Sequence, residues 1–304
     1  MTRTQAHGAG PAPTSGALRG IGWMLLAGGC FVVVTGIVRH LGTDMNPVQA
    51  AFIRYAFGFA FLAPVWLRFL RAPPPLSRVG VHAIRGLVHG LGVMLWFFAM
   101  TRIPIAQVTA LGFTAPIFTT IGAAIFLGET FRLRRFVAVL LGFAGTLVIL
   151  KPGIDVVDIG AVAQLSAAPL FAVSLLIAKK LTETESPTTI VAYLSIFVTL
   201  ALLPPALYVW RAPTLEELAW LFVTALSATL GHVCMTRAFR ATEITVTQPV
   251  SFLQLVWATL LGLYLFGEQP DAWTWAGGAI IVGSATYIAH REARQRRLPR
   301  SVGG

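Results

Sequence analysis

The sequence contains one segment twice, and the two copies lie 139 residues apart. Residues 126–129 (Phe-Leu-Gly-Glu) end one long apolar segment, and residues 265–268 (Leu-Phe-Gly-Glu) end another. An internal duplication sets the architecture of a chain, because both copies must fold into the same kind of unit. The same shift brings further like residues onto each other: Ala99 onto Ala238, Ile105 onto Ile244, Phe113 onto Phe252 and Thr120 onto Thr259.

The composition indicates that the duplicated unit is embedded in a membrane. Of the 304 residues, 56% are hydrophobic and 12% are charged, and the mean hydropathy is +0.75. A soluble domain carries about 25% charged residues, so most of this surface must face lipid. The net charge of +11 does not indicate a nucleic-acid partner, because the basic residues lie in loops between apolar segments.

Ten apolar segments are long enough to cross a bilayer, which takes about 20 residues of α-helix. A helix satisfies its own backbone hydrogen bonds where no water is present, so each segment is predicted to be helical. The predicted fold class is an all-α integral membrane protein with ten transmembrane helices, arranged as two inverted five-helix repeats. The predicted spans are residues 18–38, 48–70, 79–101, 104–127, 134–150, 159–180, 188–209, 215–239, 244–266 and 273–290.

The chain is predicted to consist of two repeats between two tails. Residues 1–17 are rich in Gly, Ala and Pro and are expected to form a disordered cytoplasmic tail. The first repeat covers residues 18–150, and the second, inverted repeat covers residues 159–290. Residues 291–304 form a basic cytoplasmic tail, which is expected to contact anionic lipid of the inner leaflet.

The Lys and Arg residues predict the orientation, because they gather in cytoplasmic loops. With the N-terminus in the cytoplasm, seventeen of them lie inside and four lie outside. Both termini are therefore predicted to be cytoplasmic. The short loops and the single basic tail favour a bacterial inner (plasma) membrane. The four outer residues are Arg39, Arg102, Lys151 and Arg211.

The loops that follow the two Gly-Glu motifs support the inversion. After Glu129, residues 132–135 (Arg-Leu-Arg-Arg) make the loop basic, as a cytoplasmic loop should be. The equivalent loop after Glu268 contains Asp271 and neither Lys nor Arg. Two related loops with opposite charge are what an antiparallel pair of repeats predicts.

Local motifs carry a family resemblance that covers nearly the whole chain between the tails. They are Arg85-Gly86, Phe98-Ala99, Pro104 through Ala110, Phe113 through Pro116, Phe126 through Glu129, Gly142 through Gly145, Lys151-Pro152-Gly153, Gly160-Ala161, Phe171-Ala172 and Phe266-Gly267-Glu268. With these motifs the chain resembles an EamA-type transporter of the drug/metabolite transporter superfamily. The resemblance implies ten spans in two repeats. It also implies transport of a small solute: such families export amino acids or drugs, and others import riboflavin, S-adenosylmethionine or nucleotide sugars.

The fourth and ninth spans are equivalent, and each carries small or polar residues along one face. Transporters built from repeats place their substrate site between the repeats, so these faces are predicted to line a central cavity. The alternative is close packing, because Gly, Ser and Thr are enriched where transmembrane helices touch. Gln248 is too large and polar for that alternative. The first face consists of Thr109, Gly112, Pro116 and Thr120, and the second of Gln248, Ser251, Leu255 and Thr259; Thr109, Gln248 and Ser251 are predicted to bind substrate.

His89 and His232 lie within the third and eighth spans, which are also equivalent. The shift of 139 places His232 on Val93, one helical turn from His89, so both are expected on nearly the same face. Ionisable groups at this depth tend to face a cavity or a partner, and an imidazole there can bind substrate or take up a proton. The alternative is a neutral histidine bonded to a neighbouring carbonyl.

Three further side chains complete the predicted substrate site. Arg54, within the second span, is a candidate for a substrate carboxylate, although it lies near enough to the outer end to reach water. Gln164 of the sixth span is expected to face the same centre. Trp257 can stack on a flat substrate, with a lipid-facing or core position as the alternative. Arg85 is expected to snorkel to the inner surface.

Glu129 and Glu268 each follow a glycine that is expected to end a helix. A carboxylate near a helix C-terminus needs a compensating partner, which Arg132 or Arg135 can supply to Glu129. Both glutamates are predicted to anchor loops or to act in gating rather than to bind substrate.

Three prolines lie inside predicted spans, where each removes a helical hydrogen bond and can kink the helix. Bent helices beside a cavity can act as gates, although kinks also serve packing alone. The three predicted gating or structural prolines are Pro116, Pro169 and Pro249.

The leading functional hypothesis from the sequence is a secondary transporter that exports amino acids or related amphipathic compounds by alternating access. One alternative is an importer of a vitamin or nucleoside-like cofactor, such as riboflavin or S-adenosylmethionine. A second alternative is a non-transporting membrane scaffold. The expected partners are a small-molecule substrate and the lipid bilayer, without nucleic acid, and the sequence leaves the oligomeric state open.

An enzyme is not predicted, and neither is a cofactor or a metal. The sequence holds no His-Glu-x-x-His metal motif and no Gly-x-Ser-x-Gly nucleophile motif. His40 and Asp44 resemble an acyltransferase pair but are one residue too close together. Cys30 and Cys234 lie in apolar segments and form neither a disulfide framework nor a zinc spacing.

Overall fold

A computed structural model describes most of the chain. The described residues are 13–41, 45–71, 76–100, 102–103, 108, 111–112, 114–129, 133–150, 159–266 and 272–294. They form helices, turns and loops, and no strand occurs among them. The helices of the first half are α1 (Pro13–Leu41), α2 (Pro47–Phe61), α3 (Ala63–Arg71), α4 (Leu76–Met100), α6 (Ala115–Phe126) and α7 (Leu133–Leu150). Those of the second half are α8 (Ile159–Leu181), α9 (Pro187–Tyr208), α10 (Leu215–Ala241), α11 (Ile244–Ser251), α12 (Leu253–Phe266) and α13 (Ala272–Arg294).

The all-α membrane class predicted from the sequence is confirmed. Six described helical segments are long and apolar enough to cross a bilayer, and three shorter apolar helices accompany them. The predicted span at 159–180 corresponds to α8, and the one at 215–239 corresponds to α10. The number of ten spans stays a prediction, because the candidate spans are identified by their length and apolar composition alone. The domain limits and the two terminal tails likewise stay predictions.

Two predicted single helices are each broken in two. The span expected at 48–70 consists of α2 and α3, which meet at Leu62 just before Ala63-Pro64. Proline has no backbone N–H to continue the helical ladder, which accounts for a break at this point. The span expected at 244–266 consists of α11 and α12, with Phe252 between them.

The break between α11 and α12 has a counterpart in the first half. The helix α6 begins at Ala115, and the shift of 139 places this residue on Gln254, one residue after the start of α12 at Leu253. Both repeats therefore start a new helix at nearly the same position of their fourth segment. Transporters commonly use discontinuous helices, whose ends expose backbone polar groups to a central site.

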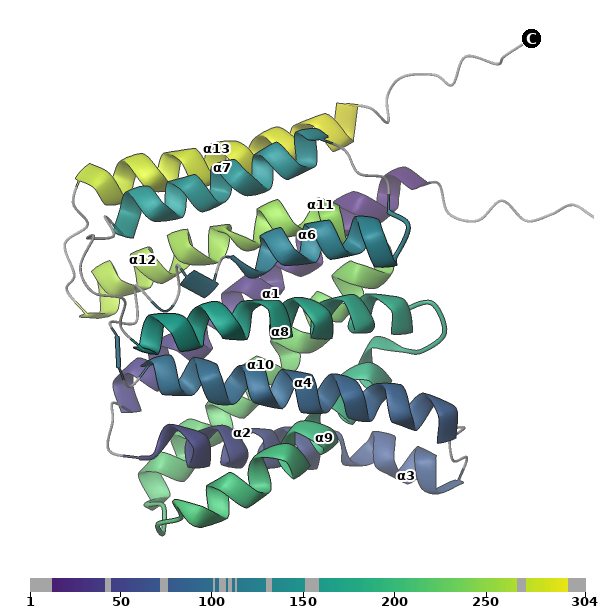
Figure 1. The fold of residues 1–304 in the computed structure, drawn as a ribbon, viewed down its shortest axis with the longest axis vertical. Helices are drawn as coiled ribbons and strands as arrows, with labels where there is room; N and C mark the ends of the chain where they lie inside the picture. The colour runs from purple at the N-terminus through teal and green to yellow at the C-terminus, as the bar shows by residue number, and fades with distance from the viewer. Residues whose placement is uncertain are drawn as a thin grey trace, which may run out of the picture.

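The packing of the helices is symmetric under exchange of the two halves. Helix α1 packs against α10, and their equivalents α8 and α4 pack against each other in the same way (Figure 1). The pair α4–α9 corresponds in the same way to the pair α10–α2. Two further pairs, α2–α9 and α7–α13, each consist of two equivalent helices in contact. Each half thus supplies the same surfaces to the other, as an internal duplication predicts.

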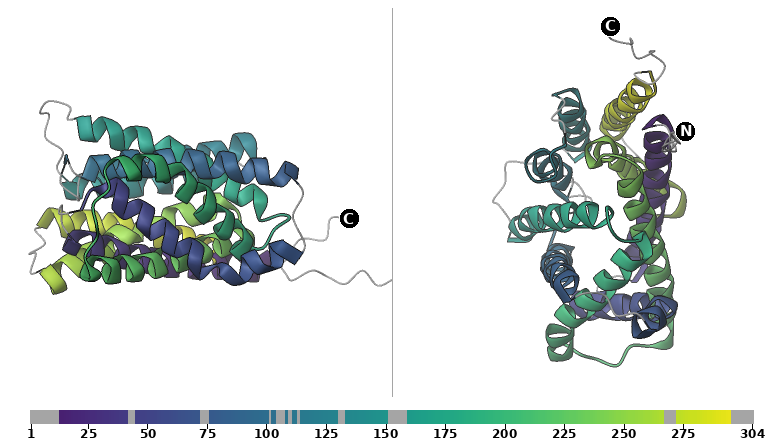
Figure 2. Two further views of the ribbon diagram at one scale, coloured as in Figure 1. Left: turned by 90° about the horizontal axis from the view of Figure 1, so that it is seen from below. Right: turned by 90° about the vertical axis from the view of Figure 1, so that its right-hand side faces the viewer.

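The direction of the helices fits an inverted arrangement of the halves. Helix α1 begins at the end of the bundle where α13 finishes, whereas α8, the first helix of the second half, begins at the opposite end (Figure 1). Most helices run along one common direction, and several are seen nearly end-on in the right-hand view of Figure 2.

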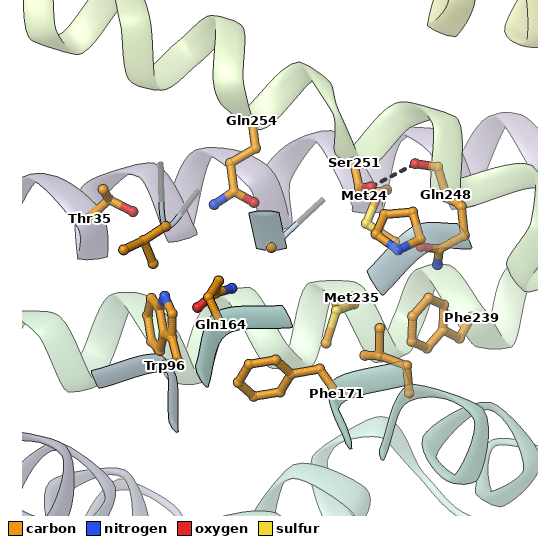
Figure 3. Close-up of a pocket in the computed structure, with 14 residues that line it drawn as sticks. Met24, Thr35, Trp96, Gln164, Phe171, Met235, Phe239, Gln248, Ser251 and Gln254 are labelled. Atoms are coloured by element: carbon orange, nitrogen blue, oxygen red, sulfur yellow. Dashed lines mark hydrogen bonds between the residues drawn. The ribbon is translucent and has the colours of Figure 1, made fainter. Parts of the chain in front are cut away.

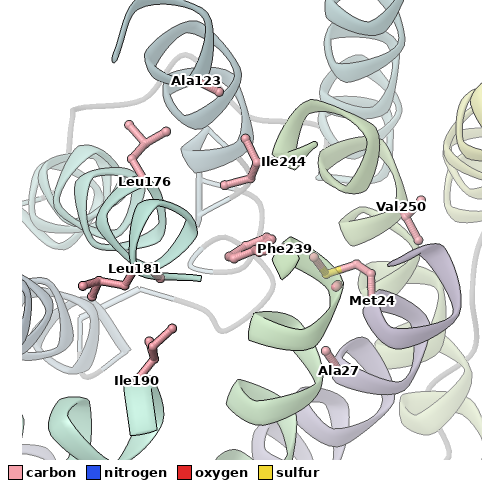
Figure 4. Close-up of a cluster of buried hydrophobic side chains, with 11 residues drawn as sticks. Met24, Ala27, Ala123, Leu176, Leu181, Ile190, Phe239, Ile244 and Val250 are labelled. Atoms are coloured by element: carbon pink, nitrogen blue, oxygen red, sulfur yellow. The ribbon is translucent and has the colours of Figure 1, made fainter. Parts of the chain in front are cut away.

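A cluster of buried apolar side chains holds the halves together. It joins Met24 and Ala27 of α1, Ala123 of α6, Leu176 of α8 and Phe239 of α10 (Figure 4). Transmembrane helices associate through close packing rather than through exclusion of water, so small residues such as these alanines let the helices approach. The whole cluster has members on six helices, α1, α6, α8, α9, α10 and α11, and holds them around the centre of the molecule.

Candidate functional site

A cavity of about 230 Å³ lies where helices of both halves meet. Side chains of α1, α4, α8, α10, α11 and α12 line it, together with residues at and before the start of α6 (Figure 3). Its lining residues are Met24, Thr35, Trp96, Val108, Gly112, Pro116, Gln164, Phe171, Leu175, Met235, Phe239, Gln248, Ser251 and Gln254.

Equivalent positions of the two halves face this cavity in pairs. Trp96 of α4 and Met235 of α10 are 139 residues apart, and both line it. Gly112 and Ser251 form a second such pair. The cavity therefore lies at the pseudo-symmetry axis, which is where transporters with repeated halves bind their substrates.

Three glutamine side chains supply most of the polarity of the cavity. Gln164 of α8 and Gln254 of α12 point toward one another from opposite walls (Figure 3). Gln248 of α11 lies further along and is 3% exposed. Gln164 is 2% exposed, and its carboxamide oxygen Oε1 has no hydrogen-bond partner among the described residues.

The remaining walls are aromatic or apolar. Trp96 and Phe171 lie on the side of Gln164, and Phe239 lies near Gln248 (Figure 3). None of the described lining residues is Asp, Glu, Lys, Arg or His. An unpaired charge is costly to bury in such a setting, so the cavity is suited to an uncharged solute surface.

The cavity brings together several residues that the sequence predicted. Gln164, Gln248, Ser251 and Pro116 line it, as does Gly112 of the predicted polar face. Thr109, the remaining substrate-binding candidate of the fourth span, lies outside the described residues.

Other residues of the two predicted faces serve packing. Thr120 is 2% exposed and does not line the cavity. Leu255 belongs to a separate apolar cluster with Val139 and Ile281. Thr259 donates a hydrogen bond of 3.0 Å to the Leu255 carbonyl on its own helix. At these positions the structure agrees with the alternative interpretation, in which the residues serve helix packing.

His89 and His232 lie next to each other, as their equivalent positions predict, but they do not line the cavity. Their ring centres are 5.6 Å apart. His89 contacts the Tyr55 hydroxyl at 3.0 Å through Nε2 and the Ser174 hydroxyl at 3.1 Å through Nδ1. The ring of His89 also meets Phe171 of the cavity wall, with centroids 5.1 Å apart. The two histidines therefore form a polar layer directly behind one aromatic wall.

Neither Arg54 nor Arg85, the two arginines considered above, reaches water. Arg54 is 7% exposed, and its guanidinium lies 4.0 Å from the centre of the Tyr55 ring. Arg85 is 1% exposed and donates to the carbonyls of Ser174 and Ile190 at 3.2 and 2.9 Å. The expectation that Arg85 snorkels to the inner surface was wrong, because helix carbonyls satisfy its guanidinium inside the bundle. Arg54 lies outside the described cavity lining.

Trp257 lies away from the cavity. Its side chain is 45% exposed on α12, so the predicted role in stacking on a substrate has no support in its position. The alternative of a lipid-facing tryptophan describes it better, because an apolar ring exposed on a transmembrane helix faces the acyl chains.

Glu129 contacts a helix of the other half. Its carboxylate oxygens accept hydrogen bonds from the backbone N–H groups of Ile244 and Thr245, at 2.8 and 3.1 Å. These are the first two residues of α11, whose own N-cap side chain, Glu243, makes no capping bond. A carboxylate at a helix N-terminus satisfies free donors and the positive end of the dipole. The equivalent residue Glu268 lies outside the described residues.

The three predicted prolines occupy different helical positions. Pro169 and Pro249 lie inside α8 and α11, where each removes a backbone donor. Pro116 lies in the first turn of α6 instead, where its missing N–H costs nothing. The expectation that Pro116 kinks the interior of a helix was therefore wrong, because the helix begins beside it.

Sequence reasoning missed several residues of the cavity. Gln254 is an amide in the middle of an apolar span, and the argument that singled out Gln248 applies equally to it. Trp96 could have been found by its pairing with Met235 under the shift of 139. Phe171 and Phe239 carry no such signal, because a phenylalanine is ordinary in a transmembrane helix.

Each half of the chain matches the model of one family of known proteins. That family is described as the EamA-like transporter family, and the matches cover residues 18–151 and 158–289. The two matched stretches correspond closely to the two repeats seen as a duplication in the sequence.

Individual relatives have different solutes in their names. The chain is 31% identical over 275 residues to an S-adenosylmethionine uptake transporter of Rickettsia bellii, with 90% of this chain and 94% of the relative covered. It is 31% identical over 297 residues to a riboflavin transporter of Vibrio cholerae, with 95% and 98% covered. A pseudopaline exporter of Pseudomonas aeruginosa is 29% identical over 262 residues, with 85% and 91% covered.

A solved crystal structure has a similar fold. It covers 93% of this chain and 99% of its own length, with a TM-score of 0.71 and 21% sequence identity. At this level of identity the likeness concerns the arrangement of the helices alone.

Proposed function

Because the chain belongs to the EamA-like transporter family, we propose that it is a secondary transporter that moves a small organic metabolite by alternating access through the cavity between its halves. The observation that carries this proposal is the pairing of equivalent residues, Trp96 with Met235 and Gly112 with Ser251, around one cavity. A site shared by two inverted halves can be opened to either side by rocking one half against the other. The family is one of transporters, so an enzyme is not the expected class.

The lining favours import of a vitamin or nucleoside-like cofactor over export of amino acids. A free amino acid carries an ammonium and a carboxylate, and each needs a partner when it leaves water. The described walls offer carboxamides, two hydroxyls and aromatic rings instead. A relative named for the transport of riboflavin supports an uncharged ring system as the solute, and a relative named for the uptake of S-adenosylmethionine supports import as the direction.

Export of amino acids or related amphipathic compounds is the second candidate. A relative named as a pseudopaline exporter supports this direction. Arg54 supports a carboxylate ligand, because it is buried and forms no ion pair with any residue that the structure describes. Arg54 does not line the described cavity, so a change in the structure would be needed to bring it into contact with a solute.

We further propose a bacterial inner membrane with both termini in the cytoplasm. The support is the distribution of Lys and Arg, seventeen inside against four outside. The start of α1 and the end of α13 at the same end of the bundle are compatible with this orientation.

Flux in proteoliposomes tests the proposed function. The purified full chain is reconstituted with a mixture of riboflavin, S-adenosylmethionine and amino acids inside, and release is followed with and without a pH gradient. Release of a defined subset supports transport, and dependence on the gradient supports proton coupling. If protein that is shown to be folded releases no more of any solute than empty liposomes do, the transport proposal fails. Accumulation in cells that express the chain then separates import from export.

A further inference from the structure

The walls of the cavity point to a narrower class of substrate. We infer that Gln164 and Gln254 recognise an uncharged planar heterocycle through its lactam or imide edge, while Trp96 and Phe171 stack on its rings. This inference rests on the proposed function, because it assigns the ligand of the same cavity.

The unpaired oxygen of Gln164 is the first reason. Buried polar atoms in folded proteins are nearly always hydrogen-bonded, so a buried oxygen without a partner among the described residues is available to a ligand. Gln164 is 2% exposed, lines the cavity, and has no described partner for Oε1. A ligand N–H that enters the cavity can satisfy this oxygen.

The second reason is the arrangement of two carboxamides across one cavity. Each carboxamide presents a carbonyl acceptor beside an NH₂ donor, which matches a ring that presents C=O beside N–H. Gln164 and Gln254 come from different helices, α8 and α12, and point toward one another (Figure 3). A ligand held between them can form hydrogen bonds along two of its polar edges at once.

The third reason is the aromatic surface beside the amides. Trp96 and Phe171 lie next to Gln164 on the same side of the cavity (Figure 3). Stacking of a flat base on an aromatic side chain is favourable and tolerates differences in ring substituents. The amides then provide the selectivity that stacking lacks.

The fourth reason is charge. The described lining has no carboxylate to accept a cation and no basic group to accept an anion. A cationic solute such as S-adenosylmethionine and a zwitterion such as tryptophan are therefore disfavoured relative to a neutral ring system.

Binding to the purified full chain in detergent tests the inference without requiring transport. The probes are riboflavin, guanosine and thymidine, which all carry an N–H beside a ring carbonyl, together with S-adenosylmethionine and tryptophan. We expect at least one neutral probe to bind at least tenfold more tightly than either charged probe. Methylation of its edge nitrogen, as in 3-methylthymidine or N3-methylriboflavin, is expected to weaken binding about tenfold.

Variants of the cavity residues test which side chain determines the preference for the unmethylated probe. Gln164→Leu keeps the bulk of the side chain and is expected to abolish the difference between the parent probe and its methylated form. Gly112→Ala is expected to weaken binding as well, because the added Cβ would lie 3.0 Å from the Gln164 amide nitrogen. Ser166→Leu, at an exposed position of the same helix, is the matched control and is expected to bind like the unmodified chain.

The possible results separate the two proposals. Tighter binding of tryptophan or S-adenosylmethionine than of all three neutral probes overturns the inference, and so does the absence of binding by all three. An unchanged preference in Gln164→Leu overturns the role of that residue. If a neutral probe binds with the expected preference but no solute crosses the membrane, the inference stands and the transport function fails.

Discussion

Trp96 on α4 and Met235 on α10 lie 139 residues apart in the sequence and line the same cavity. The duplication thus extends to the lining of the cavity as well as to the packing of the helices. The pair is also unequal, because one half contributes a flat aromatic ring and the other a flexible thioether. Identical halves would build a symmetric cavity, whereas a divergent pair gives one wall for stacking and one that adapts to shape.

This asymmetry predicts unequal effects of substitution. Trp96→Ala is expected to raise the KM for the transported solute about tenfold, because a stacking surface of 1–3 kcal/mol is lost. Met235→Ala is expected to raise it less, since a thioether contributes shape and little directional contact. Initial rates of flux in proteoliposomes measure both. Leu91→Ala, at an exposed position of α4, is the control; equal effects of all three changes would contradict the assignment of the aromatic wall.

The Glu129 carboxylate links the halves by accepting hydrogen bonds from the backbone of α11 rather than from another side chain. Glu129→Ala removes both hydrogen bonds to the start of α11 and is expected to lower the free energy of unfolding by about 1 kcal/mol. Glu129→Gln keeps one acceptor oxygen and is expected to lose less. Thermal unfolding in detergent measures the difference.

A second glutamate provides the control for that experiment. Glu183 forms a pair with Lys180 at 2.8 Å in which both side chains are more than half exposed. Exposed pairs contribute little to stability, so Glu183→Gln is expected to leave the unfolding temperature unchanged. A shift as large as that of Glu129→Ala would show that loss of charge, and not loss of the cap, is what the measurement detects.

The sequence predicted the helices well because their signal is local. Long apolar segments separated by turn residues mark a helix wherever the bilayer excludes water, and α8 and α10 begin at their predicted residues, 159 and 215. The neighbourhood of His89 and His232 was also predictable, because the repeat and the helical period together place them on one face. The break at Leu62 was not predicted, although Pro64 offered a signal for it.

The partners of polar groups were harder to predict, because they depend on contacts between helices. Glu129 accepts hydrogen bonds from Ile244 and Thr245, 115 and 116 positions away, and no local pattern indicated these partners. Its expected partners, Arg132 and the side chain of Arg135, lie outside the described residues. Arg85 was expected at the surface, yet carbonyls on α8 and α9 hold it inside. Nothing within one segment reveals which backbone of another helix will lie beside it.

His89 joins three helices through its two ring nitrogens, and this predicts energetic coupling. His89→Phe keeps a planar ring and removes the contacts with Tyr55 of α2 and Ser174 of α8. Tyr55→Phe removes one of those contacts alone. In a double-mutant cycle of unfolding free energies, the coupling between His89 and Tyr55 is expected to be about 1 kcal/mol. Additive losses would show that the observed contact contributes nothing to stability.

The closest approach between α4 and α9 gives the last prediction. A Cβ added at Gly86 would lie 2.2 Å from the Cβ of Phe197 and 3.2 Å from its backbone. Because the obstacle is the root of the side chain and not its flexible end, rotation of Phe197 cannot relieve the clash. Gly86→Ala must therefore push α4 and α9 apart, and overpacking of this kind costs about 1–3 kcal/mol.

Gly80 on the same helix separates this clash from the general effect of glycine on a helix. A Cβ at Gly80 meets nothing within 4 Å, so Gly80→Ala is expected to gain about 0.5–1 kcal/mol from the better helix propensity of alanine. Thermal unfolding of both variants in the same detergent should move in opposite directions. If Gly86→Ala is as stable as the unmodified chain, α4 and α9 do not approach as closely as described. The burial of Arg85 and His89, which lie near Gly86 on α4, would then need a different explanation.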